Sequence, residues 1–145
     1  MSVGMSRFDI LEGLRDRFQN SRLADVVSGM WLGRAPDDTQ PPYIVMSNVS
    51  GGPPREGMNG RKLQTLAVEI TIYSVERGLE EILHLFDLQC DVFDDYQYEV
   101  KDGAVIMVHR GGDMLDELGE DEGNGWLCRV EYTVLADNQV RTQAD

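Results

Sequence analysis

The side chains best suited to chemistry in this sequence are two histidines, two cysteines and a run of carboxylates. His84 and His109 lie far apart, and neither has a second ligand at the i+3 or i+4 spacing that would bring two side chains to one metal ion. Cys90 and Cys128 have no CxxC neighbour and no Cys/His cluster around them. The spacing favours core or surface histidines and buried thiols over metal ligands or a disulfide, and it indicates a reducing compartment.

The carboxylates gather between Gly111 and Gly125, in the sequence GGDMLDELGEDEGNG. Ca²⁺ is bound by several carboxylates, but this run lacks the EF-hand order of ligands around a central glycine. Acid–base catalysis by paired carboxylates needs a cleft that raises one pKa, whereas these side chains are predicted to be exposed. A solvated acidic loop is therefore favoured over a calcium site. Its candidate residues are Asp113, Asp116, Glu117, Glu120, Asp121 and Glu122.

Other catalytic signatures are not found in the sequence. It contains no GxSxG, HExxH or P-loop pattern, and Gly111-Gly112 precedes acids that would repel a phosphate. We therefore predict no catalytic residue, no metal site and no cofactor.

A second unusual segment, PPYIVMSNVSGGPPREGMNGRK, runs from Pro41 to Lys62. Its first part, Tyr43 to Val49, has the β-branched and aromatic residues of a strand, but Ser50 to Gly60 holds four glycines and two prolines. Such a segment buries little apolar area, so we expect a long loop that orders against a neighbouring subunit. The residues assigned to this interface are Pro53, Pro54, Arg55, Arg61 and Lys62.

The elements that position these segments follow from hydrophobic periodicity. Spacings of three and four predict a short helix through Phe8, Leu11, Leu14 and Phe18 with Ser6 as its N-cap. The same spacing predicts a long helix whose apolar stripe is Leu79, Ile82, Leu83, Phe86, Cys90 and Phe93. Its last turn ends at Asp94 and Asp95, where acids interact unfavourably with the helix dipole. Either solvent or an outside partner would have to stabilise these two carboxylates.

Strict alternation makes Leu66 to Tyr73 the clearest strand, with Leu66, Val68, Ile70 and Ile72 on one face. Further strands are predicted at Ala104 to His109 and Trp126 to Leu135. Together with the strand from Tyr43, these elements predict an α+β fold. It has a mostly antiparallel four-stranded sheet packed by one long helix, with a short N-terminal helix and two long loops.

Length and charge set the remaining limits. With 145 residues and 41% hydrophobic content, we expect a single domain over 1–145, with a core of about 7–137 and a flexible C-terminal tail at 138–145. No apolar run is long enough for a membrane span or a signal peptide, so a soluble, non-exported protein is expected. Residues 1–78 hold nine acids and nine bases, and residues 79–145 hold seventeen acids and four bases. Such acidity argues against tight binding to DNA or anionic membranes, and by itself it favours a role in solubility.

The order of these elements also carries a resemblance. The segments FDILEGLRDRF, PPYIVMSNVS, LQTLAVEITIYS, GLEEILHLFDLQCDVFDD and WLCRVEYTVLADN, with the long loop, resemble the tail-completion or tail-terminator proteins of long-tailed bacteriophages over about residues 7–137. The resemblance implies a non-enzymatic virion protein that forms hexameric rings at the neck. Its partners would be the tail tube and the head–tail connector, and DNA would pass through the lumen without specific binding. The acidic segment from Gly111 to Gly125 departs from that pattern.

The charge fits this interpretation in two ways that the sequence does not separate. Carboxylates around a lumen would repel DNA phosphates, and carboxylates on an outer surface would suit a basic docking partner. Copies of the chain would join head to tail, basic loop to acidic surface. The resemblance places the protein in the virion, and in the host cytoplasm during assembly. Two alternatives stay open: a head-closure or connector neck protein, and a small intracellular α+β enzyme or metal- or ligand-binding domain.

Overall fold

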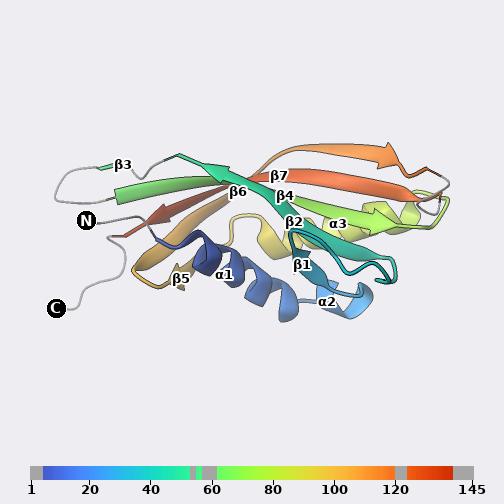
Figure 1. Cartoon of the computed structure of the whole chain (residues 1–145), viewed down its shortest axis with the longest axis horizontal. Helices are drawn as coiled ribbons and strands as arrows, with labels where there is room; N and C mark the ends of the chain where they lie inside the picture. The colour runs from blue at the N-terminus through green and yellow to red at the C-terminus, as the bar shows by residue number, and fades with distance from the viewer. Residues whose placement is uncertain (1–4, 53–54, 57–61, 120–123, 139–145) are drawn as a thin grey trace.

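The computed structural model describes residues 5–52, 55–56, 62–119 and 124–138. Within them the fold is α+β, and Figure 1 shows three helices beneath one elongated, curled sheet. The helices are α1 (Arg7–Gln19), α2 (Leu23–Val26) and α3 (Glu80–Phe93). The strands are β1 (Met30–Leu32), β2 (Tyr43–Gly51), β3 (Arg55–Glu56), β4 (Lys62–Ser74), β5 (Tyr98–Val100), β6 (Gly103–Glu117) and β7 (Trp126–Asp137).

The described strands follow the order β1-β2-β4-β7-β6-β5, and β3 pairs with β4. The sheet is mixed, because β1 runs parallel to β2 while the other pairs are antiparallel. The four predicted strands correspond to β2, β4, β6 and β7, so the prediction of a four-stranded sheet was wrong. It missed the short strands β1, β3 and β5, which each add two or three residues to an edge of the sheet.

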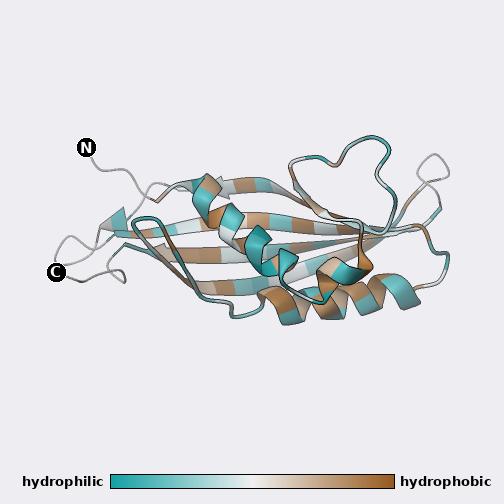
Figure 2. Ribbon diagram, turned by 90° about the horizontal axis from the view of Figure 1, so that it is seen from below, coloured by the Kyte–Doolittle hydropathy of each residue, from teal (hydrophilic) through white to brown (hydrophobic). Residues whose placement is uncertain are grey.

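One face of the sheet carries the core. Leu66, Val68, Ile70 and Ile72 on β4 are each at most 2% exposed, which confirms the predicted face of this strand. They pair with Val134, Tyr132, Val130 and Cys128 on β7, so that two buried rows run side by side. Figure 2, viewed from the helix side, shows α1, α2 and α3 all lying across this face. The opposite face of the sheet has no helix over it among the described residues.

Both predicted helices are present, but each is rotated from its predicted orientation. The Ser6 hydroxyl does accept a hydrogen bond from the Asp9 N–H, as expected of an N-cap. Yet Phe8 is 61% exposed and Ile10 is buried in its place. On α3 the buried side chains are Ile82, Leu85, Gln89, Val92 and Phe93, whereas Leu79 and Leu83 are exposed.

Where the structure describes them, parts of both predicted long loops are strand. β6 continues to Glu117, paired with β7, and it passes through a bulge between Arg110 and Asp113. β2 continues to Gly51 opposite Leu66, so the prediction that Ser50 and Gly51 belong to a free loop was also wrong. Cross-strand hydrogen bonds hold these segments in strands, although their polar side chains alone would not favour a strand.

Candidate functional site: two charged ends and an uncovered sheet face

The oppositely charged segments lie at opposite ends of the sheet. The register pairs Leu63 with Asp137 at one end, and Ser74 with Trp126 at the other. Glu117 also pairs with Trp126, which puts the acidic hairpin β6–β7 at the second end. With roughly 3.3 Å per residue along the 12 residues of β7, the ends are about 36 Å apart. One chain therefore cannot neutralise its own acidic end with its basic hairpin.

The basic end is the hairpin formed by β3 and β4. Arg55 lies on β3, opposite Leu63, and its side chain is exposed. Lys62 pairs with Glu56; its N–H donates to the Asn138 Oδ1 atom at 2.8 Å, and its carbonyl accepts from the Asn138 N–H at 3.2 Å. The structure thus places two of the predicted interface residues, Arg55 and Lys62, on one hairpin. The other three, Pro53, Pro54 and Arg61, lie outside the described residues.

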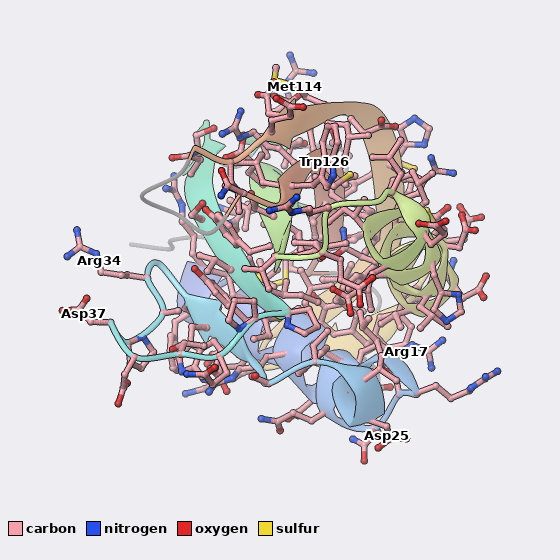
Figure 3. All side chains as sticks on the ribbon, turned by 90° about the vertical axis from the view of Figure 1, so that its right-hand side faces the viewer. Arg17, Asp25, Arg34, Asp37, Met114 and Trp126 are labelled. Carbon is pink, nitrogen blue, oxygen red and sulfur yellow. The ribbon has the colours of Figure 1, made fainter. Side chains whose placement is uncertain are left out.

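The acidic end is the second half of β6. Asp113, Asp116 and Glu117 are all exposed, as predicted, although they belong to a strand and not to a loop. Met114 lies between them and is 49% exposed. Figure 3, viewed from this end, shows Met114 pointing away from the helices. The remaining predicted acids, Glu120, Asp121 and Glu122, lie outside the described residues.

The uncovered sheet face holds an aromatic row that the sequence reasoning did not select. Trp31 contacts Tyr43 edge to face at 6.2 Å between ring centroids, and Tyr43 stacks on Tyr73 at 4.8 Å. The row crosses β1, β2 and β4. Tyr73 could have been found from the sequence, because alternation places it on the face opposite the buried residues of β4. Trp31 could not, because β1 is too short to show a period.

Beside this row, an ion pair and two neighbouring contacts link side chains from four strands, β2, β4, β6 and β7. Arg129 on β7 pairs with Glu69 on β4, with 3.5 Å between the Arg129 Nε and Glu69 Oε2 atoms. Glu69 also accepts a hydrogen bond from the Asn48 amide, and the Arg129 Nη1 atom lies 3.6 Å from the Met114 sulfur. Aromatic residues and arginine are enriched in the centres of protein interfaces. The uncovered face therefore has the composition of a contact surface.

The acidic end of α3 has a partner within the chain. The Arg110 Nε atom donates to both carboxylate oxygens of Asp94, at 3.0 and 3.2 Å, and the guanidinium lies 5.5 Å from the Phe86 ring centroid. This contact offsets the unfavourable position of Asp94 at a helix C-terminus. An outside partner is therefore not needed to explain that residue.

The histidines and cysteines singled out in the sequence do not join a metal-binding group among the described residues. No group of three or more metal-binding side chains occurs among residues 5–52, 55–56, 62–119 and 124–138. Burial raises the pKa of the Cys90 and Cys128 thiols to about 11, so neither forms a reactive thiolate near neutral pH. His84 and His109 are both exposed.

One hollow of about 280 Å³ lies between the α1–α2 turn and α3, lined in part by Leu23, Arg22 and Asp91. Another lining residue, Arg17, is already engaged, because its Nε atom donates to the Val92 carbonyl and its guanidinium lies over the Tyr96 ring. Its lining residues include neither a histidine nor a cysteine. None of the described helices is long and apolar enough to cross a bilayer.

Taken together, the described part of the chain has an α+β fold with one sheet face covered by helices, one face without a helix, an end that carries Arg55 and Lys62 and an end that carries Asp113, Asp116 and Glu117. Its fold is similar to that of a chain from the virion of a native gene transfer agent particle, with a TM-score of 0.60. The likeness covers 86% of this chain and 90% of that chain, at 6% sequence identity. No protein-family model and no curated protein sequence matches the chain. At this identity, the comparison establishes a shared fold.

Proposed function

We propose that this protein is a non-enzymatic structural subunit of a phage-like virion. The observation that carries the proposal is the fold shared with a gene transfer agent virion chain over nearly the full length of both chains. The sequence resemblance to tail-completion proteins, stated above from element order, points to the same class. The surfaces support it as well: the charged ends and the aromatic face suit contacts with other proteins, and the described residues hold no group of three or more metal-binding side chains.

Within that class, we propose a tail terminator or tail-completion subunit. Copies would form a ring, hexameric by the resemblance, that caps the tail tube, meets the head–tail connector and lets DNA pass. Its acidity fits a passage for DNA, because carboxylates add no counterion-release affinity for phosphates. A head-closure or connector protein is the second candidate, and it would use the same surfaces.

The two charged ends suggest how copies join. A contact between the basic end of one copy and the acidic end of the next is heterologous, and repeated heterologous contacts close into a ring when the rotation between copies permits. The 36 Å separation, estimated at about 3.3 Å per residue, prevents self-neutralisation and leaves both ends available to neighbours.

The test is assembly of the purified full chain. Light scattering coupled to size-exclusion chromatography, with negative-stain microscopy of the same fractions, should show rings or ring-competent oligomers. Arg55→Glu with Arg61→Glu should reduce assembly and leave the melting temperature nearly unchanged, because exposed charges contribute little to stability. Arg34→Glu is the matched control, since Arg34 is exposed on the loop between β1 and β2.

The competing class makes a different prediction. If the acidic segment were a metal-dependent lid, calcium would raise the melting temperature, because a ligand that binds the native state stabilises it. Neutralising Asp116, Glu117, Glu120, Asp121 and Glu122 as Asn or Gln would abolish that shift. Our proposal expects no calcium shift, an intact fold in this variant, and slightly stronger retention of duplex DNA by the assembled ring. A monomer with a calcium-dependent melting shift would favour the enzyme or metal-binding class.

A further inference from the structure

β6 is much longer than the strand that covers its outer edge. β5 pairs only with Gly103 to Val105. Two further contacts extend this cover: the Gln97 side-chain amide donates to the Ile106 carbonyl and the Asp95 N–H donates to the Val108 carbonyl, both at 3.0 Å. Beyond Val108, no described strand pairs with the outer edge of β6 as far as Glu117. Figure 1 shows this half of β6, in orange, along the upper right margin of the sheet.

The main chain of this edge is oriented for pairing. The Leu118 N–H donates to the Gly125 carbonyl at 2.8 Å, so Leu118 faces the β7 side. Because backbone groups alternate in an antiparallel ladder, Glu117, Leu115 and Asp113 direct their N–H and C=O groups to the outer edge. Unpaired groups of this kind are a template for adding a strand from another chain.

The side chains on this edge decide which strand it accepts. Pairing of the edge with itself across a two-fold axis would bring Asp113, Asp116 and Glu117 against the same acids of a partner, and like charges directly opposite are destabilising. The acids therefore oppose a symmetric dimer and favour a strand with basic side chains.

The other margin of the sheet offers such a strand. β1 covers only Ile44 to Met46 of β2, so no described strand lies outside the rest of β2 or outside β3. This open margin presents Arg55, which is exposed on β3 next to Glu56, while the Gly51 carbonyl on β2 already accepts a hydrogen bond from the Arg7 guanidinium at 3.2 Å. Each chain thus has one acidic open edge and, at the opposite end, an open edge that presents Arg55.

We propose that the outer edge of β6, from Asp113 to Glu117, pairs with the outer edge of β2 and β3 in a second copy of this chain. The inference rests on the proposed function only in requiring that copies assemble. Strand pairing fixes how the two copies are oriented, in addition to which charges meet. The interface is heterologous, because each copy uses two different edges. The sheet would then continue from one subunit into the next.

The first experiment blocks the edge with proline. Leu115→Pro removes an N–H that faces outward, so the pairing with β7 is kept while strand addition is blocked. Leu115→Ala is the matched control, because it removes the side chain but keeps the N–H. We expect Leu115→Pro to melt cooperatively and stay monomeric by light scattering, whereas wild type and Leu115→Ala assemble.

The second experiment tests direction by mixing. Arg55→Glu places an acid on the other open edge, and we expect it to weaken assembly at least tenfold. A mixture of the Leu115→Pro and Arg55→Glu proteins keeps one intact edge of each kind, so it should give a 1:1 dimer that does not extend. Should Leu115→Pro fail to fold, Asp113→Lys with Glu117→Lys replaces it, and mixing that protein with Arg55→Glu should restore assembly.

The outcomes separate the two proposals. If wild type assembles and the Leu115→Pro, Asp113→Lys/Glu117→Lys and Arg55→Glu variants assemble equally well, the edge pairing and the contact between charged ends are both wrong, and the proposal of an assembling virion subunit stands. If each variant alone stays monomeric but no mixture gives a dimer or restored assembly, the heterologous pairing is wrong. If wild type stays monomeric under all conditions, both proposals fail.

Discussion

Ile70→Asp is the most stringent test of how the sheet is oriented. Ile70 is 1% exposed on β4 and lies between Met46 on β2 and Val130 on β7, both equally buried. Loss of the buried side chain alone, as in Ile70→Ala, should cost about 2 to 5 kcal/mol. Burying an unpaired carboxylate adds several kcal/mol, which together approaches the whole stability of a domain, about 5 to 15 kcal/mol.

We therefore expect Ile70→Asp to be unfolded or insoluble, and Ile70→Ala to fold with a melting temperature lowered by roughly 5 to 15 °C. Ala67→Asp is the matched control, because Ala67 is exposed on the opposite face of the same strand. Circular dichroism melting of the three purified proteins is the assay. A soluble Ile70→Asp protein that melts cooperatively near the wild-type temperature would show that the faces of β4 are reversed.

Two further predictions concern the interior. Gln89 is fully buried, and neither its amide atoms nor the buried Tyr132 hydroxyl has a hydrogen bond within the usual limits. Gln89→Met should therefore keep or raise the midpoint of urea unfolding. A fall in the free energy of unfolding above about 2 kcal/mol would show that the amide is satisfied in the folded protein. Burial raises the pKa of Cys90 and Cys128 to about 11, above the ordinary value of 9.0. Stability should therefore be fully present below pH 9 and fall between pH 9 and 11, and Cys128→Ala should reduce that fall; an unchanged fall in this variant would assign it to other groups.

The sequence predicted the elements whose pattern is set by burial on one face. The alternation of Leu66 to Tyr73 and of Trp126 to Val134 located β4 and β7 and their buried faces, because a sheet with one covered face requires that alternation. The period from Leu79 to Phe93 located α3. Its rotation was not predictable, because Leu83 and Leu85 are equally apolar and only the packed sheet decides which of them is buried.

The polar strands were missed for a different reason. The second half of β6 contains Gly111, Gly112 and exposed acids, which are typical of loops, yet pairing with β7 and a bulge accommodate them. β1 and β5 hold three residues each, too few to show a period. The composition of the candidate surfaces was predictable, but their separation to opposite ends depends on strand register.

The central claim, that the chain is a ring-forming virion subunit, is tested most directly by the mass of the purified full chain. Light scattering over a range of concentration and salt should find a species several times the 16.3 kDa chain mass, about 98 kDa for six copies, with rings in the same fraction by microscopy. A particle of 16.3 kDa at every concentration and salt, alone and in the presence of a tail-tube protein, would contradict the account.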